Sequence, residues 1–135
     1  MSRRGRFPAL LLVAVVVLAG LFLLVDHRGG DGAPASGRDR CDLAGLPVQA
    51  DRTVQEIKTG GPFPYRQDGV VFDNREGRLP QEPHGWYHEY TVVTPGSDDR
   101  GERRIIAGGR DETSPEVLYY TADHYASFCL VAGAG

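Results

Sequence analysis

The sequence predicts an α+β fold in which one N-terminal helix packs on an antiparallel β-sheet, preceded by an N-terminal hydrophobic segment. One stretch has helical periodicity, with apolar residues recurring on a single face. Every later patterned stretch is a short run of aromatic and β-branched residues bounded by turn residues. One helix followed only by strands favours a sheet with the helix on one face.

The helix is expected from about residue 47 to residue 59. Pro47 suits the first turn because its missing N–H would have no helical partner there. Gly60 and Gly61 are typical of a helix end. The apolar face consists of Ala50, Val54 and Ile57.

Strands are expected after the helix, wherever aromatic and β-branched runs lie between turn residues. The expected ranges are 69–73, 86–93, 103–108, 117–121 and 126–131. Thr94-Pro95-Gly96 and Gly108-Gly109 are turn signals between them. The proline-rich stretch GGPFPYRQDG predicts an ordered loop with a cis Phe63-Pro64 bond.

The N-terminal region predicts export from the cytoplasm. Three arginines precede an uncharged apolar run of seventeen residues, from Ala9 to Val25. That length exceeds a typical signal-peptide core and just reaches the length of a spanning helix, so residues 1–25 are either a signal peptide or a signal anchor. In both cases the rest of the chain should lie outside, secreted or anchored.

Residues 26–40 read as a flexible linker, because glycine, proline, serine and charged residues dominate there. Residues 41–135 are enough for one domain with one core. From residue 40 onward, fifteen Asp and Glu oppose ten Lys and Arg, so this part carries a net charge of −5 with neutral histidines. Such a balance argues against non-specific nucleic-acid packaging, which depends on many phosphate-binding cations.

The runs WYHEYTVVTPGSDDRGERRIIAG and YYTADHY contain the groups needed to cleave RNA without a metal. Glu89 is the candidate general base for the 2′-hydroxyl, and His124 is the candidate general acid for the departing 5′-oxygen. Arg100 and Arg104 can stabilise the charged phosphoryl oxygens. Each group alone is more often part of an ordinary surface ion pair, and only the combination is selective.

Four longer stretches resemble the secreted microbial guanyl-specific ribonucleases of the barnase type, especially their small acidic members. The stretches are GGPFPYRQDGVVFDNREGRLP, GWYHEYTVVTPG, RGERRIIAGG and YYTADHYASF. The resemblance implies the catalytic roles given above, and it implies a phosphate or nucleotide contact at Tyr125.

The resemblance also implies a guanine site on the stretch FDNRE. Glu76 would accept the N1 and N2 hydrogens of guanine, backbone amides around Asn74 and Arg75 would bind O6, and Phe72 would lie near the base. Guanine presents two adjacent N–H donors to one carboxylate, and a wrong base would leave buried polar groups unpaired. Without the surrounding resemblance, DNRE reads as an ordinary polar turn.

Three classes of function fit parts of the sequence. An endoribonuclease that cleaves single-stranded RNA after guanosine is favoured, because acid, base and both arginines are present. A catalytically silent RNA- or protein-binding module on the same scaffold is the alternative, and a membrane-anchored structural protein leaves the polar groups unexplained. No cofactor or metal is expected, since the four histidines are scattered and no carboxylates have ligand spacing.

A monomer is expected, with an acidic, barstar-like inhibitor as a further partner, because an active ribonuclease endangers the cell that makes it. Contact with a membrane is expected only through the N-terminal segment.

Cys41 and Cys129 are the only cysteines, and an exported domain permits them to pair. In the ribonucleases that the chain resembles, the second cysteine of this bridge lies at the extreme C-terminus, whereas Cys129 falls inside the last expected strand. Two free, buried thiols are therefore the alternative to a disulfide.

Overall fold

The computed structural model describes residues 39–134. The apolar segment and most of the expected linker lie outside these residues. Among the residues described, no helix has both the length and the apolar character needed to cross a membrane.

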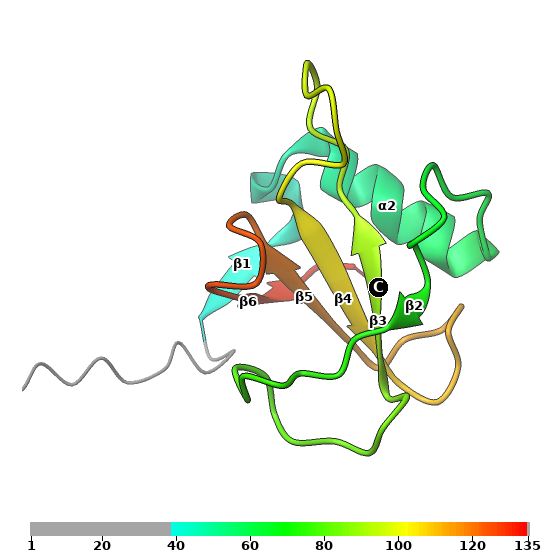
Figure 1. Ribbon diagram of the computed structural model, residues 1–135, viewed down its shortest axis with the longest axis vertical. Coiled ribbons are helices and arrows are strands. Elements are labelled where there is room, and N and C mark those ends of the chain that lie inside the picture. Colours follow the sequence, from blue (N-terminus) through cyan, green and yellow to red (C-terminus); the bar gives the residue numbers. More distant parts are fainter. Residues whose placement is uncertain (1–38, 135) are drawn as a thin grey trace, which may run out of the picture. The chain divides into compact units, whose positions relative to one another are not determined.

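One α-helix lies against one face of a six-stranded sheet, so the predicted α+β class is confirmed (Figure 1). The helix, α2, spans Val48–Thr59, and a short 3₁₀ helix, η1, spans Leu43–Gly45. The strands are β1 (Arg40–Asp42), β2 (Val70–Val71), β3 (Tyr87–Thr91), β4 (Arg104–Gly108), β5 (Val117–Thr121) and β6 (Cys129–Ala132). Their order in the sheet is β1-β6-β5-β4-β3-β2.

The sequence did not predict β1, which pairs with β6 in parallel while every other neighbouring pair is antiparallel. The strand has three residues, two of them charged, and therefore shows no alternation of apolar and polar residues. Backbone pairing defines it instead: Arg40 lies opposite Leu130, and the Leu130 N–H donates to the Asp39 carbonyl at 2.6 Å.

Local signals place the ends of α2 within one residue of the expected range. Pro47 is the N-cap residue, and Gly60 ends the helix in the left-handed conformation with φ of 72°. The Gly60 N–H donates to carbonyls of the last helical turn, which would otherwise be unpaired.

The loop after α2 contains one cis peptide bond, but it is Gly61-Pro62 and not the predicted Phe63-Pro64. That prediction was wrong because cis and trans X-Pro bonds differ by only about 0.5–1 kcal/mol. The path of the folded loop, rather than the local sequence, decides which proline follows a cis bond.

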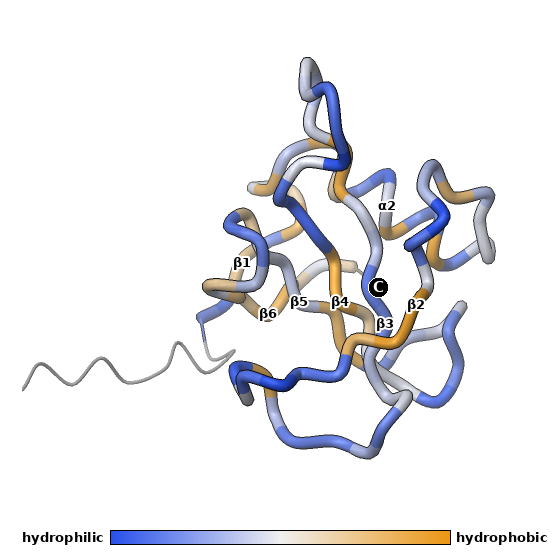
Figure 2. The backbone as a smooth tube through the Cα atoms, in the orientation of Figure 1, coloured by the Kyte–Doolittle hydropathy of each residue, from blue (hydrophilic) through white to orange (hydrophobic). Residues whose placement is uncertain are grey.

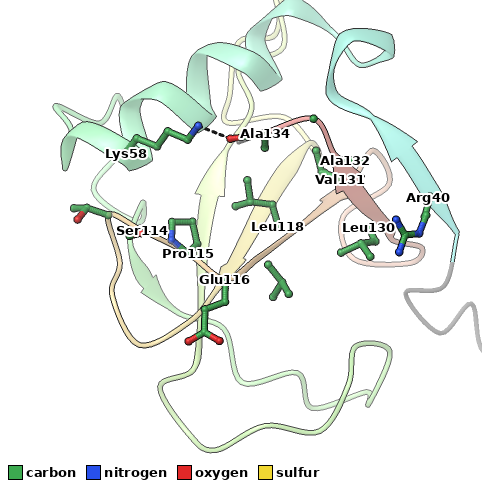
Figure 3. Close-up of a pocket in the computed structure, with 13 residues that line it drawn as sticks. Arg40, Lys58, Ser114, Pro115, Glu116, Leu118, Leu130, Val131, Ala132 and Ala134 are labelled. Carbon is green, nitrogen blue, oxygen red and sulfur yellow. Dashed lines mark hydrogen bonds between the residues drawn. The ribbon is translucent and has the colours of Figure 1, made fainter.

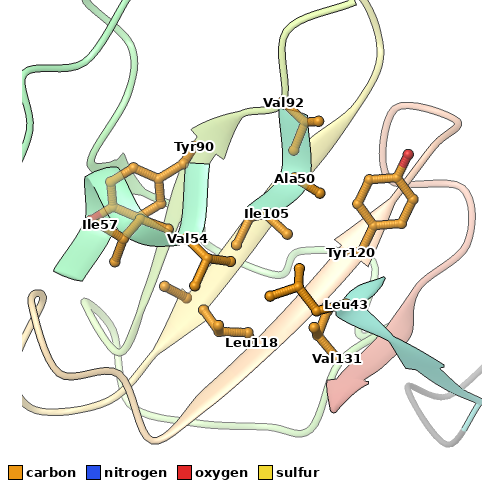
Figure 4. Close-up of a cluster of buried hydrophobic side chains, with 11 residues drawn as sticks. Leu43, Ala50, Val54, Ile57, Tyr90, Val92, Ile105, Leu118, Tyr120 and Val131 are labelled. Atoms are coloured by element: carbon orange, nitrogen blue, oxygen red, sulfur yellow. The ribbon is translucent and has the colours of Figure 1, made fainter. Parts of the chain in front are cut away.

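The two faces of the sheet serve different purposes. The face toward α2 carries the main hydrophobic cluster (Figure 4), which includes Val54 and Ile57 of the helix, Tyr90 of β3 and Ile105 of β4. Hydrophobic residues are concentrated on β2 and much of β4, whereas β3 and the long loops are mostly hydrophilic (Figure 2). Because side chains alternate along a strand, the neighbours of Tyr90 in β3 point to the opposite face. That face carries a second, smaller hydrophobic cluster, which includes Tyr87 and Ile106, and it also holds the polar side chains of Glu89 and Thr91.

Cys41 and Cys129 form a disulfide with a Cα–Cα distance of 5.7 Å, which confirms the predicted pairing. The β1–β6 register explains why a cysteine within β6, rather than at the C-terminus, can form this disulfide. Cys41 lies opposite Val131, two residues from Cys129, so the two cysteines lie on the same face of neighbouring strands.

Replacing both cysteines with alanine is expected to lower the free energy of unfolding by about 4 kcal/mol, because the bond closes a long loop in the unfolded chain. The cysteines are 88 residues apart. Urea unfolding of the double variant, with the reduced parent protein as control, measures this. A loss below about 1 kcal/mol would contradict the loop-entropy explanation.

Candidate active site

Glu89 and Arg104 lie on the face of the sheet that α2 does not cover. In the β3–β4 register, Glu89 is opposite Ile106 and Thr91 is opposite Arg104, so the two charged side chains occupy adjacent rows of one face. The Glu89 side chain is 13% exposed, and Arg104 as a residue is 3% exposed. His88 points the other way and lies 3.6 Å from Glu112, as strand alternation predicts.

Arg100 forms hydrogen bonds with Glu89 and with two more deeply buried residues, Asp68 and Thr91. Its Nη1 donates to Glu89 Oε1 at 2.9 Å, its Nη2 to Asp68 Oδ1 at 3.2 Å, and its Nε to Thr91 Oγ1 at 2.6 Å. Burial alone would lower the pKa of Arg100, but hydrogen bonds and attraction from Glu89 and Asp68 outweigh it and raise the pKa. The guanidinium therefore remains charged in this site.

Tyr125 holds the second oxygen of Glu89, because its hydroxyl donates to Glu89 Oε2. Burial raises the pKa of Tyr125, and the hydrogen bond to the Glu89 carboxylate raises it further. The Tyr125 ring lies 5.2 Å from the Phe72 ring and 4.7 Å from the His124 ring, measured between centroids. Arg104 places its guanidinium carbon 6.0 Å from the same ring centroid. Tyr125 thus lies beside Glu89, Phe72, His124 and Arg104.

The loop between β5 and β6 carries His124 in an exposed position. His124 and Tyr125 have φ angles of 53° and 73°, a region that non-glycine residues seldom adopt. Asp123 stabilises this turn by accepting from Thr121 Oγ1 at 2.9 Å and from the Ser127 N–H at 2.9 Å. Burial raises the pKa of Asp123, but the hydrogen bonds outweigh it and the pKa is lowered. The backbone strain therefore persists because an ionised side chain supports it.

Arg104 is oriented by its own chain. Its Nη1 donates to the carbonyls of Gly101 and Arg103 at 2.8 and 2.7 Å. Its Nε is buried and has no hydrogen-bond partner within residues 39–134. A buried donor without a partner carries a desolvation cost, so the local structure must compensate for it elsewhere.

The expected base-binding residues lie on the loop between β2 and β3, which runs along the bottom of Figure 1. The Asn74 side chain donates to the Leu79 carbonyl at 2.9 Å and accepts from the Leu79 N–H at 3.0 Å, so it closes the loop. Arg75 pairs with Asp73 at 3.1 Å, and Glu76 is exposed. Phe72, at the start of the loop, connects it to Tyr125 through the ring contact described above.

A cavity of about 670 Å³ lies away from these residues, between β5, β6 and the C-terminal end of α2 (Figure 3). Lys58 crosses its rim and donates to the Ala134 carbonyl. None of the predicted site residues lines it. The candidate site around Glu89 is therefore separate from this cavity.

A family model described as ribonuclease matches residues 30–132. Guanyl-specific ribonuclease Sa3 from Kitasatospora aureofaciens is 61% identical over 89 residues, which are 66% of this chain and 60% of that protein. Guanyl-specific ribonuclease Sa from the same organism is 56% identical over 66% of this chain and 88% of its own. The chain belongs to the microbial guanyl-specific ribonuclease family.

Solved structures of relatives agree with this family assignment. A crystal structure of ribonuclease Sa2 with guanosine-2′-cyclophosphate superposes with a TM-score of 0.63 at 46% identity, covering 70% of this chain and 96% of that one. A structure from a study of ribonuclease Sa2 with mononucleotides gives a TM-score of 0.66 at the same identity, covering 73% and 97%.

Sequence reasoning missed two residues of this candidate site, Asp68 and Thr91. Asp68 lies in the stretch RQDG, which reads as a turn, and a turn aspartate ordinarily serves local backbone bonds. Strand alternation could have indicated Thr91, since it lies two residues after Glu89 and therefore on the same face. No local signal links either residue to Arg100.

Proposed function

We propose that this domain is a guanyl-specific endoribonuclease that cleaves single-stranded RNA 3′ of guanosine without a metal. The observation that carries the proposal is the Glu89 carboxylate, held between Arg100 and Tyr125 on the face of the sheet that α2 does not cover, with Arg104 and His124 beside Tyr125. The family membership supports the same activity.

In the proposed first step, Glu89 removes the proton of the 2′-hydroxyl, and the 2′-oxygen attacks phosphorus. The bond from phosphorus to the 5′-oxygen breaks, and His124 gives that oxygen a proton. The product is a 2′,3′-cyclic phosphate. In the second step, water opens the ring to a 3′-phosphate while His124 and Glu89 exchange roles.

Arg100 and Arg104 would stabilise the negative charge that develops on the phosphoryl oxygens. Two observations support this role. Both guanidiniums are oriented by hydrogen bonds before substrate arrives, so little reorganisation is needed. Arg104 also lies beside the ring of Tyr125, whose hydroxyl binds Glu89, so its charge acts close to the proposed general base.

The guanine site is proposed on residues 72–76. Glu76 would accept the N1 and N2 hydrogens, and the backbone N–H groups near Asn74 and Arg75 would donate to O6. The Asn74 side chain supports this assignment indirectly, because its two bonds to Leu79 hold the loop in a fixed shape. The relative crystallised with guanosine-2′-cyclophosphate supports a guanine nucleotide as ligand.

We also propose the cellular setting and the domain organisation. Residues 1–25 would target the chain to the membrane as a signal peptide or anchor, residues 26–40 would act as a linker, and residues 41–135 would act outside the membrane as a monomer. The disulfide supports an oxidising compartment. An acidic, barstar-like inhibitor would cover Arg100, Arg104 and His124.

Short RNAs that contain a single guanosine, incubated in chelator with the full chain and with Glu76→Ala, test this function. The parent protein is expected to cut only after guanosine and to leave a 2′,3′-cyclic phosphate. Glu76→Ala should lose most of the preference for guanosine while still cutting, because a site that hydrogen-bonds a base rejects other bases through its unpaired polar groups.

Two results would contradict the proposal in different ways. No cleavage by folded protein would favour a silent binding module, whereas unchanged selectivity in Glu76→Ala would remove only the base-site assignment. Glu82→Ala is the matched control, because Glu82 is exposed on the same loop between β2 and β3.

A further inference from the structure

The Asp68 carboxylate is almost completely buried, with 1% of the side chain exposed. Its Oδ2 accepts from the Tyr65 N–H at 3.1 Å. Its Oδ1 accepts from the Thr91 N–H at 2.7 Å, from Thr91 Oγ1 at 2.6 Å and from Arg100 Nη2 at 3.2 Å. A buried carboxylate is costly unless it is paired in this way, so the arrangement must serve the fold, the site or both.

The Thr91 hydroxyl completes a closed set of hydrogen bonds behind Arg100. A hydroxyl has one hydrogen, and here it is donated to Asp68 Oδ1, so the oxygen is left to accept from Arg100 Nε at 2.6 Å. Two of the three guanidinium nitrogens are therefore held from beneath by Asp68 and Thr91. Only Nη1 reaches Glu89 on the reactive face.

We propose that Asp68 and Thr91 are positioning residues that hold the Arg100 guanidinium in the orientation needed for the phosphoryl transition state. The inference rests on the proposed function, in which Arg100 binds the phosphoryl oxygens. Neither residue touches substrate, and both act through Arg100.

The proposed chemistry gives this arrangement a purpose. Before substrate binds, Arg100 forms ion pairs with both Glu89 and Asp68. When Glu89 takes the 2′-hydroxyl proton it becomes neutral, so its hold on Arg100 weakens at the moment when charge builds on the phosphoryl group. Asp68 takes no part in the proton transfer and keeps its charge. Asp68 and Thr91 therefore continue to hold the Arg100 guanidinium in its orientation, while Nη1 becomes free for a phosphoryl oxygen.

Thr91→Val tests the proposal because it keeps the shape of the side chain and removes only the hydroxyl. We expect kcat to fall about 10–100-fold, with KM changed less than about threefold, since misplacing a transition-state group affects the chemical step. Thr91→Ser restores the hydroxyl and should recover activity to within about threefold of the parent.

Thr53→Val is the matched control. Thr53 is also buried, and its hydroxyl lies 3.0 Å from the Thr91 carbonyl oxygen and 2.9 Å from the Gln49 carbonyl oxygen, either of which can accept its one hydrogen, with no bond to Arg100. This variant should lose stability but keep kcat per folded molecule. The NMR signal of the Arg100 Nε–H should show faster solvent exchange in Thr91→Val and remain unchanged in Thr53→Val.

Arg100→Ala, alone and combined with Thr91→Val, separates this proposal from the proposed function. If Thr91 acts through Arg100, Thr91→Val should lower kcat no further once Arg100 is absent. The same full decrease in that background, or a parent-like kcat in Thr91→Val alone, would overturn the positioning role. A parent-like kcat in Arg100→Ala would instead overturn the catalytic role of Arg100.

Discussion

Replacing Glu89 with glutamine is expected to lower turnover by about 10²–10⁴-fold, the usual consequence of losing a general base. Glutamine has nearly the same shape and can still accept from Arg100 or Tyr125, so the fold should be retained. The acidic limb of the pH–rate profile should disappear, because no carboxylate then has to lose a proton before it can act. Steady-state kinetics on a single-guanosine RNA across the acidic range provide the measurement.

Glu112→Gln is the matched control for this experiment. Glu112 is exposed and lies beside His88, whose side chain points to the opposite face from Glu89. The control should keep both the rate and the acidic limb. A Glu89→Gln rate within fivefold of the parent would show that another group removes the proton.

Replacing His124 with alanine is also expected to reduce turnover by about 10²–10⁴-fold, because the departing 5′-oxygen would leave without a proton. The basic limb of the pH–rate profile should be lost with it. A guanosine 3′-phosphodiester whose leaving group is a nitrophenolate needs no such proton. On that substrate the variant should approach the parent rate.

The nitrophenolate ester makes the His124 experiment specific to the role of the general acid. An equal loss on both substrates would mean that His124 serves binding or folding instead. His88→Gln is a suitable control, since His88 lies on the other face of β3 and its imidazole pairs with Glu112.

Tyr125 would link the proposed base site to the proposed catalytic groups. Its hydroxyl binds Glu89, and its ring lies near the rings of both Phe72 and His124. A guanine seated near Phe72 would therefore lie within one side chain of both the general acid and the general base. Correct base binding would place the 3′-phosphate of that nucleotide against Arg104, which also lies beside the ring.

The acidic net charge does not conflict with an RNA substrate. Fifteen acidic residues from residue 40 onward determine the overall field, whereas the local field around Glu89 depends on Arg100 and Arg104. Both arginines are largely buried, so solvent screens them less than it screens exposed charges. The affinity for RNA is thus expected to depend mainly on these two arginines and to fall only moderately as the salt concentration rises.

Residue patterns along the chain were enough to predict the helix and five of the six strands. Apolar periodicity, capping residues and turn residues each involve only a few neighbouring residues, so they can be recognised directly in the sequence. The same holds for the shared face of Glu89 and Thr91, which follows from strand alternation.

Tertiary structure alone decided the strand order, the parallel pairing of β1 with β6 and the cis bond at Gly61-Pro62. It also decided which groups surround Arg100: Asp68 is 32 residues away in the chain and Glu89 is 11 residues away. These features depend on backbone pairing and on contacts between distant segments. Neither produces a periodic pattern of side chains, so only the folded chain reveals them.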